Sequence, residues 1–173
     1  MANKMENLDL EIAHFRNFRQ HVPGMEKCCQ ETVEKLLELG VIEVSTAFEQ
    51  ALGKLGDHEV VSQNCGDLYR DGKYSDAKLS SVRTSGYGKK YSAQVSAIHG
   101  KTGTLRVQVY ERKKNQFYYF AFPRNTYIDI PKSSNIEIPF ELDGTPRRKP
   151  LRKVYVNWWK YEVDTLNLVA NKY

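Results

Sequence analysis

The sequence has few cysteines, no long apolar run and no apolar leader. Its three cysteines, Cys28, Cys29 and Cys65, are an odd number without CxxC spacing, which excludes a disulfide framework and a cysteine zinc site. No apolar stretch approaches the roughly 18 to 20 residues that a transmembrane helix needs. The first residues, MANKMENLDLE, lack the apolar centre of a signal peptide. These absences predict a cytoplasmic protein with reduced thiols and no membrane partner.

The composition is that of a folded chain. Its 173 residues are 40% hydrophobic and 27% charged, which excludes a disordered protein and allows one domain with a substantial core. Charge is divided unevenly: residues 1–80 hold 9 Lys+Arg and 14 Asp+Glu (9 − 14 = −5), and residues 81–173 hold 17 and 7 (17 − 7 = +10). All eleven tyrosines lie from Tyr69 onward. A basic, aromatic half suggests nucleic acid as a partner, and a solvated strand surface is an equal alternative.

Hydrophobic periodicity changes from helical to strand-like near residue 58. Apolar residues at steps of three and four predict helices over 5–20, 25–39 and 46–56. Strands are predicted over 59–62, 66–69, 74–80, 92–98, 104–112 and 117–122, with Asp71-Gly72 as a hairpin turn. The aromatic run 117–122 is expected as a buried strand, with a base-stacking platform as the alternative, and Trp158-Trp159 is expected in the core with a partner interface. We therefore predict one α+β domain over 1–173, with a helical part (1–57), a catalytic sheet (58–123) and a C-terminal extension (124–173).

Acids and a lysine converge around the predicted hairpin. Asp76 and Lys78 are two residues apart on one strand, so their side chains share a face of the sheet. An antiparallel hairpin can bring Asp67 to the same edge. Paired carboxylates with open positions are ligands that suit Mg²⁺ rather than zinc, and the lysine can orient a water or offset charge on a phosphate.

This pattern of Asp67, a hairpin and Asp76-Ala-Lys78 resembles the PD-(D/E)xK nuclease superfamily, which includes many type II restriction endonucleases. The resemblance implies a mixed sheet flanked by helices and a hydrolase that cuts double-stranded DNA with Mg²⁺, or with Mn²⁺ as a substitute. It assigns Asp67 and Asp76 as metal ligands, Lys78 as the catalytic lysine and Glu49 as a supporting acid and ligand. Glu43 is the alternative to Glu49, and the chain departs from the family in having Gly66 where a Pro is common and Asp as its second acid.

Basic and small residues follow the motif directly. Their composition predicts contacts with a DNA backbone, and we expect a homodimer because cutting both strands with one small domain calls for two-fold symmetry. The string Gly100-Lys101-Thr102 lacks the upstream glycine of a P-loop, which excludes that kind of nucleotide site. Arg147, Arg148 and Lys149 form a further basic stretch that is equally well explained as a solvated loop. The residues predicted to bind DNA are Arg83, Ser85, Tyr87, Lys89, Lys90, His99 and Lys101.

Simpler interpretations stay open. Asp76 and Lys78 can be an exposed ion pair of about 0–1 kcal/mol, Asp67 a hairpin cap and Glu49 part of a capping box. The alternatives to a site-specific endonuclease are therefore a non-catalytic nucleic-acid-binding α+β protein and a homing or junction nuclease.

Overall fold

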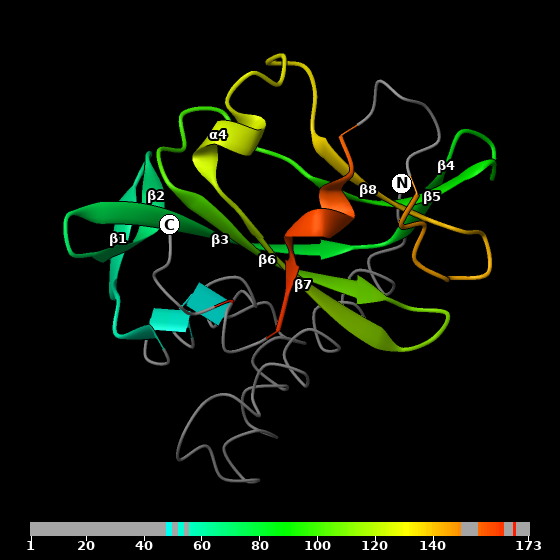
Figure 1. The fold of residues 1–173 in the computed structure, drawn as a ribbon, viewed down its shortest axis with the longest axis horizontal. Helices are drawn as coiled ribbons and strands as arrows, with labels where there is room; N and C mark the ends of the chain where they lie inside the picture. Colours follow the sequence, from blue (N-terminus) through cyan, green and yellow to red (C-terminus); the bar gives the residue numbers. More distant parts are fainter. Residues whose placement is uncertain (1–47, 50–51, 54–55, 150–155, 165–167, 169–173) are drawn as a thin grey trace, which may run out of the picture.

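The computed structural model describes residues 48–49, 52–53, 56–149, 156–164 and 168 (Figure 1). The helices predicted for 5–20 and 25–39 lie outside these residues, as do Cys28, Cys29 and Glu43. The described residues of the helix predicted for 46–56 are all helical. No helix within the described residues is both long enough and apolar enough to cross a bilayer.

Strands make up most of the regular secondary structure in the described chain, and all six predicted strands are present. Their bounds agree with the sequence pattern within a few residues, and the largest difference is at the strand predicted for 92–98. That strand ends at Val95, and Ala97 follows with a left-handed φ of 54°. The elements are β1 (Glu59–Gln63), β2 (Gly66–Arg70), β3 (Lys73–Ser81), β4 (Arg83–Ser85), β5 (Lys90–Val95), β6 (Thr104–Glu111), β7 (Gln116–Phe122), α4 (Arg124–Tyr127), β8 (Ile136–Phe140), η2 (Trp158–Tyr161) and β9 (Glu162–Val163).

The main sheet is mixed, as predicted. It has six strands in the order β1-β2-β3-β6-β7-β9 (Figure 1). β3 and β6 run parallel, and every other neighbouring pair is antiparallel. The chain therefore crosses over between β3 and β6 through residues 82–103. The flanking helices that were predicted for this sheet are not among the described elements, apart from the few helical residues between 48 and 56.

The predicted Asp-Gly turn joins β2 to β3. Asp71 and Gly72 have φ values of 50° and 78°, so both central residues are left-handed, as in a type I′ turn. This turn matches the twist of the two strands and fixes their pairing, in which Leu68 lies opposite Ser75 and Arg70 lies opposite Lys73. The turn thus sets the register between Asp67, which precedes it, and Asp76, which follows it.

A second, three-stranded sheet takes two of its strands, β4 and β5, from the crossover and the third, β8, from residues that follow α4. Its order is β4-β5-β8, with both pairs antiparallel. The sequence places the whole of 58–123 in one catalytic sheet, whereas β4 and β5 pair away from the main sheet with β8. The two sheets are joined where the Ser80 hydroxyl donates to the Gln94 carbonyl oxygen at 2.8 Å.

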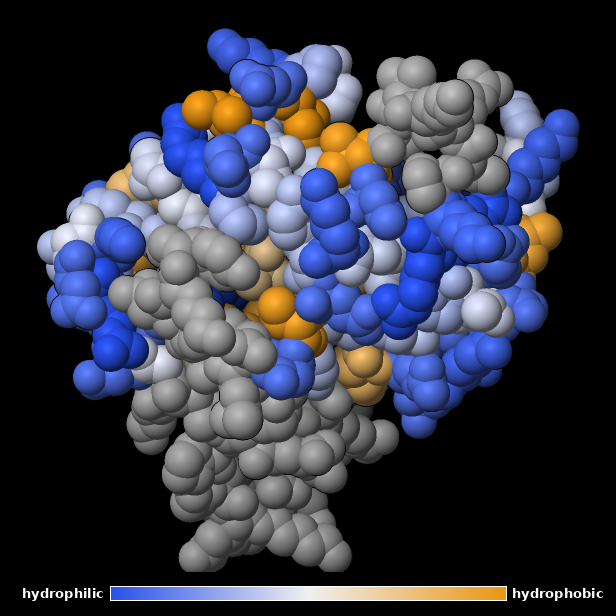
Figure 2. Space-filling model, in the orientation of Figure 1, coloured by the Kyte–Doolittle hydropathy of each residue, from blue (hydrophilic) through white to orange (hydrophobic). Residues whose placement is uncertain are grey.

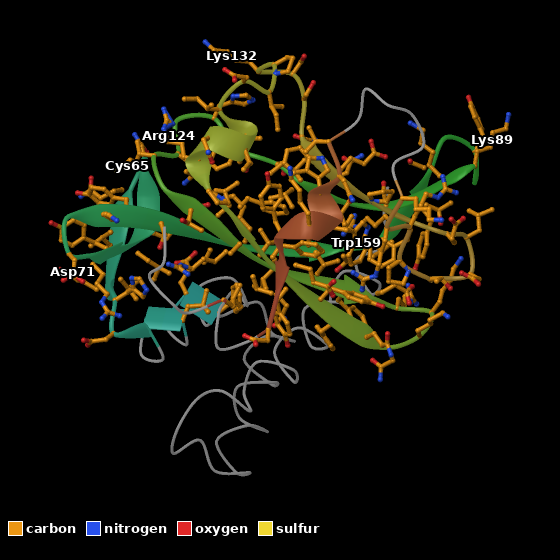
Figure 3. The ribbon with its side chains drawn as sticks, viewed as in Figure 1. Cys65, Asp71, Lys89, Arg124, Lys132 and Trp159 are labelled. Atoms are coloured by element: carbon orange, nitrogen blue, oxygen red, sulfur yellow. The ribbon has the colours of Figure 1, made fainter. Side chains whose placement is uncertain are left out.

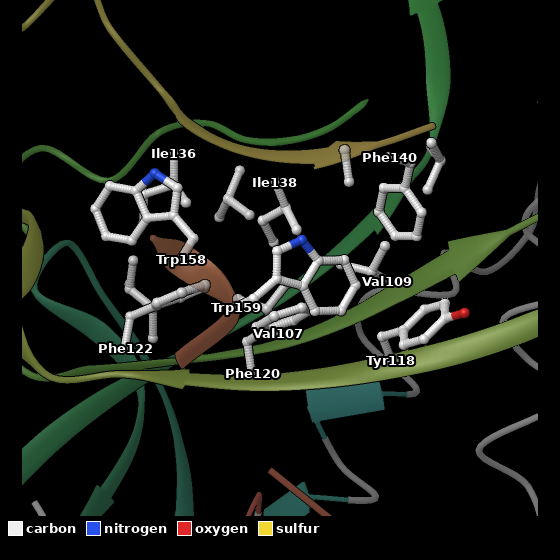
Figure 4. Packing of buried hydrophobic residues seen from close by; sticks show 14 of the residues in the cluster. Val107, Val109, Tyr118, Phe120, Phe122, Ile136, Ile138, Phe140, Trp158 and Trp159 are labelled. Carbon is white, nitrogen blue, oxygen red and sulfur yellow. The ribbon is translucent and has the colours of Figure 1, made fainter. Parts of the chain in front are cut away.

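The hydrophobic core lies between the two sheets and contains the tryptophan pair (Figure 4). Trp159 makes edge contacts with Phe120 of β7 at 5.2 Å and with Phe140 of β8 at 5.1 Å, measured between ring centroids. Its indole N–H donates to the Pro139 carbonyl at 3.0 Å. Trp158 packs on Phe122, and both tryptophans are buried. The prediction of a core position for this pair is therefore confirmed, and η2 connects the sheets.

Candidate active site

The β2–β3 hairpin brings the two predicted acids together. Leu68 lies opposite Ser75, so continuing this register by one residue places Asp67 opposite Asp76. Residues directly opposite in an antiparallel pair project from the same face. Asp76 is completely buried, whereas Asp67 is partly exposed. The hairpin therefore fixes one acid inside the protein and leaves its neighbour within reach of solvent.

Lys78 reaches the same carboxylate, as its spacing predicts. Its Nζ lies 2.7 Å from Asp76 Oδ2, and its side chain is 20% exposed. Because Asp76 is fully buried, this is not the exposed ion pair with a small contribution to stability that was the simpler interpretation of the sequence. The side chains of Asp67, Asp76 and Lys78 thus converge on one face of β2 and β3.

Lys101 is a member of this group that sequence analysis did not place there. Its Nζ lies 2.7 Å from Asp76 Oδ1, and its side chain is only 14% exposed. The parallel pairing of β3 with β6 explains this position, because Thr104 at the start of β6 lies beside Ser75. The loop leading into β6 therefore arrives at Asp76. The sequence assigns Lys101 to DNA contact, and in this structure its ammonium group faces the acids.

The loop that carries Lys101 is held at several points. The Thr102 N–H donates to the Cys65 carbonyl oxygen at 3.1 Å, and the Arg124 guanidinium donates to the Lys101 carbonyl oxygen at 3.1 Å. The Tyr127 hydroxyl of α4 donates to the Gly103 carbonyl oxygen. These contacts tie the loop to the β1–β2 turn on one side and to α4 on the other. Lys101 is therefore presented from a fixed backbone.

A glycine is required where this loop meets β3. A Cβ added to Gly103 would lie 1.6 Å from the Tyr74 carbonyl oxygen, a distance that no side chain can occupy. Gly66, which precedes Asp67, has a similar but looser contact, because its Cβ would lie 2.6 Å from the Ser75 carbonyl oxygen. Close backbone approach at these two glycines brings Asp67, Asp76 and Lys101 into one small volume.

Glu49, the supporting acid suggested by the family resemblance, lies near the same carboxylates. Burial raises the pKa of Glu49 to about 7, and the charges of Asp67 and Asp76 add to the increase. Lys78 and Lys101 act in the opposite direction. We call Glu49, Asp67, Asp76, Lys78 and Lys101 the acid–lysine cluster.

The two aspartates of the cluster have opposite proton affinities. Burial, together with a polar contact with Asp76, raises the pKa of Asp67 to about 6. Burial would also raise the pKa of Asp76, but polar contacts with Asp67, Lys101 and Lys78 outweigh it and lower the pKa below its usual value. Asp76 therefore stays ionised, whereas burial and the neighbouring carboxylates favour the protonated forms of Asp67 and Glu49.

The cluster has oxygen ligands of the kind that a hard divalent cation prefers. Neither Asp76 oxygen has a hydrogen-bond partner of regular geometry among the described residues, although both lie within ion-pairing distance of a lysine. A cation would relieve the repulsion between the three carboxylates, so the residue types fit. In the described part of the chain, however, no three His, Cys, Asp or Glu side chains are already grouped as metal ligands. A cation would compete with the lysines for Asp76.

Most of the other predicted DNA-binding residues lie far from this cluster. They belong to the β4–β5 hairpin and are exposed, and Figure 3 shows Lys89 at the opposite end of the molecule from Cys65 and Asp71. His99 is exposed on the loop that leads to Lys101. The hairpin residues are Arg83, Ser85, Tyr87, Lys89 and Lys90.

The basic stretch near residue 148 is largely engaged within the protein. The Arg147 guanidinium donates twice to Glu141, with both distances 2.8 Å. Arg148 pairs with Glu162 and lies over the Trp159 ring, 4.6 Å from its centroid. These contacts favour the interpretation of this stretch as a loop over that of a DNA-contacting segment.

What the arrangement can do chemically follows from its charges. A buried carboxylate held by two ammonium groups, next to two acids with raised pKa values, can hold a cation, donate or accept a proton, and face a phosphate with positive charge. Comparison of the chain with protein-family models, curated proteins and solved structures gave no match.

Proposed function

We propose that the protein is a metal-dependent endonuclease that hydrolyses phosphodiester bonds in double-stranded DNA. One observation carries the proposal: Asp67, Asp76 and Lys78 share one face of the β2–β3 hairpin, with Lys78 Nζ 2.7 Å from a fully buried Asp76. A buried acid–lysine pair next to partly exposed acids is costly to maintain for structure alone. It resembles the arrangement of the PD-(D/E)xK nucleases on the positions Asp67, Asp76 and Lys78.

Asp67, Asp76 and Glu49 are the residues that would hold Mg²⁺. The cation supplies Lewis acidity toward a phosphoryl oxygen when it is bound. The raised pKa values of Glu49 and Asp67 support this assignment, because burial and, secondarily, the neighbouring carboxylates disfavour their ionised forms, which a cation would stabilise. Active sites are regions where such perturbed groups gather.

Lys78 and Lys101 give the cluster its positive charge. Both ammonium groups are fixed by Asp76, so they need little reorganisation when a phosphate arrives. Lys78 lies on the rigid β3 strand. It is the lysine that would orient a water or protonate a leaving oxygen. Lys101 lies on a loop that α4 and the β1–β2 turn hold, and it adds a second positive charge beside Asp76.

The charge distribution favours DNA as the substrate. Between Asp76 and Glu111 the sequence contains no Asp or Glu, while it contains six Lys or Arg: Lys78, Arg83, Lys89, Lys90, Lys101 and Arg106. A phosphate backbone is the commonest partner of such a segment. Site-specific cutting of both strands by a homodimer is part of the same proposal.

The test is cleavage of a supercoiled plasmid with Mg²⁺ or Mn²⁺. Wild type should produce linear DNA, and both Asp76→Asn and Lys78→Ala should abolish the product. Asp71→Asn is the matched control, because Asp71 is an exposed acid in the turn of the same hairpin and Asn tolerates its left-handed φ of 50°. Cleavage that persists in both cluster variants would place the chemistry elsewhere in the chain.

A second candidate is a non-catalytic DNA-binding protein. The observation that favours it is the occupation of both Asp76 oxygens by lysines, in a described region without a ready group of metal ligands. In that case the cluster is a buried structural network. Wild-type protein would then bind plasmid DNA without cutting it under any divalent cation, and Asp76→Asn would reduce stability but leave DNA affinity unchanged.

A further inference from the structure

The β4–β5 hairpin has a thin, exposed tip with one aromatic ring at its end. Residues 86–88 are Gly-Tyr-Gly, with left-handed φ values of 59°, 57° and 80°. The turn is closed where the Lys89 N–H donates to the Gly86 carbonyl oxygen at 3.2 Å. A Cβ added to Gly88 would meet nothing within 4 Å, so the tip is open on that side.

The Tyr87 ring is fully exposed and is not packed against the described part of the protein. Its exposed fraction is 105%, the highest of the exposed large hydrophobic side chains among the described residues. A tyrosine with a left-handed backbone between two glycines has little intrinsic stability, and burial does not offset that cost here. The position therefore favours a role in contact with another molecule.

Positive charge surrounds the tip. Arg83, Lys89 and Lys90 are all exposed, and no ion pair joins Lys89 or Lys90 to another residue of the described chain. Ser85 lies opposite Lys90, so small hydroxyl and cationic side chains share one face. Figure 2 shows strongly hydrophilic residues at the end of the molecule where this hairpin projects. The partner that fits these charges is a polyanion.

The base of the hairpin is fixed in the core. Beyond the tip, β5 pairs with β8 over five residues, and Tyr91, Ala93 and Val95 are buried. The Ser92 hydroxyl also donates to Glu137 at 3.1 Å. The hairpin is thus a projection on a rigid base, which lowers the entropy lost when it contacts a partner.

We propose that residues 83–90 form an arm that inserts the Tyr87 ring against the bases of duplex DNA, while Arg83, Lys89 and Lys90 contact phosphates on either side. This proposal rests on DNA being the substrate of the proposed function. Aromatic stacking is tolerant of sequence, because every base presents a π face. Side chains that wedge between base steps are also a known means of bending DNA. The arm would therefore strengthen binding and distort the duplex without reading a sequence.

The arm acts away from the acid–lysine cluster. Figure 3 shows Lys89 and Cys65 at opposite ends of the long axis, and Cys65 adjoins the loop that presents Lys101. Substitutions in the arm should therefore change the affinity for DNA without altering the acid–lysine cluster itself. This separation allows the arm to be tested without any cleavage.

The test is fluorescence anisotropy of the full chain with a labelled 40-base-pair duplex in EDTA. Tyr87→Ala should weaken binding about 10-fold, and Tyr87→Phe, which keeps the ring, should bind as wild type does. Lys89→Ala should reduce the slope of log affinity against log salt by about 0.9, whereas Tyr87→Ala should leave the slope unchanged. Lys132→Ala, an exposed lysine outside the arm, is the matched control and should change neither quantity.

Insertion has its own readout. A duplex that contains 2-aminopurine should show a fluorescence change with wild type and Tyr87→Phe but not with Tyr87→Ala. Equal affinity and equal 2-aminopurine signals in all variants would overturn the arm, and so would a wild type that binds no duplex. The nuclease proposal has a separate outcome. If the protein cuts plasmid DNA and the arm variants bind DNA as wild type does, only the arm proposal is refuted. If DNA binding depends on the arm but the protein never cuts DNA, only the nuclease proposal is refuted.

Discussion

Lys101 Nζ and Asp76 Oδ1 lie 2.7 Å apart, although 25 residues separate the two positions (101 − 76 = 25). Lys78 holds the other oxygen of the same carboxylate at the same distance. Asp76 is thus clamped between a lysine on its own strand and a lysine from a distant loop. This double contact is the centre of the first prediction.

Lys101→Ala should lower the free energy of unfolding by about 1–3 kcal/mol, because it leaves one oxygen of a fully buried carboxylate without its charge partner. Urea denaturation measures the change, with Lys73→Ala as an exposed control on the same hairpin. In the double variant with Asp76→Asn, the loss should be smaller than the sum of the single losses. Strictly additive losses would show that the two side chains do not interact.

The same ion pair should compete with a divalent cation. Mn²⁺ at 100-fold its Kd should stabilise wild type by about 2.7 kcal/mol in thermal unfolding, and Asp67→Asn should remove most of the effect. Lys101→Ala should bind Mn²⁺ about 10-fold more tightly, since one positive charge no longer opposes the ion. Asp71→Asn is the control and should behave as wild type. Unchanged stability of wild type with Mn²⁺ would count against the cation site.

Gly103→Ala should lower the free energy of unfolding by about 3 kcal/mol, because its Cβ would overlap the Tyr74 carbonyl oxygen at 1.6 Å and force the loop away from β3. The displaced loop should also weaken the Lys101 contact and reduce any nuclease activity. Gly100→Ala is the comparison: its φ of 84° is strained for alanine, but no atom lies within 4 Å, so about 1 kcal/mol is expected. Equal losses for both glycines would argue against the close contact.

The Tyr127 hydroxyl gives a prediction for alkaline pH. Burial raises the pKa of Tyr127 to about 12, from an ordinary value of 10.0. The folded state therefore keeps its proton more tightly than the unfolded state, and stability should fall as pH rises from about 10 to about 12. Tyr127→Phe should show a shallower fall over that window in urea denaturation. Tyr87→Phe, which removes a fully exposed hydroxyl, should fall as steeply as wild type.

Local patterns were sufficient to predict much of the sheet. The alternation in 66–69 and 74–80, together with the Asp71-Gly72 turn, predicts the hairpin because both signals depend on neighbouring residues only. The same hairpin then places Asp67, Asp76 and Lys78 on one face. The nuclease assignment built on them stays a prediction, because geometry alone does not test activity.

Long-range pairing was beyond local patterns. The alternation in 104–111 predicts a strand but not that it runs parallel to β3 with Thr104 beside Ser75. For that reason Lys101 was predicted to contact DNA and not Asp76. The separate sheet of β4, β5 and β8 was missed for a similar reason, since β5 and β8 are connected by pairing between residues about 45 positions apart, such as Tyr91 and Phe140 at 140 − 91 = 49.

β3 carries Asp76 and Lys78 of the acid–lysine cluster and leads, after one residue, into β4. Every residue from Ser75 to Ser81 is paired with β6, and Val82 continues the contact by donating to the Tyr110 carbonyl oxygen at 2.9 Å. The connection between the acid–lysine cluster and the β4–β5 hairpin is therefore held by strand pairing along its whole length. If both proposals hold, β3 acts as a molecular ruler: the base step that Tyr87 enters should lie a constant number of base pairs from the severed bond, whatever the sequence between them.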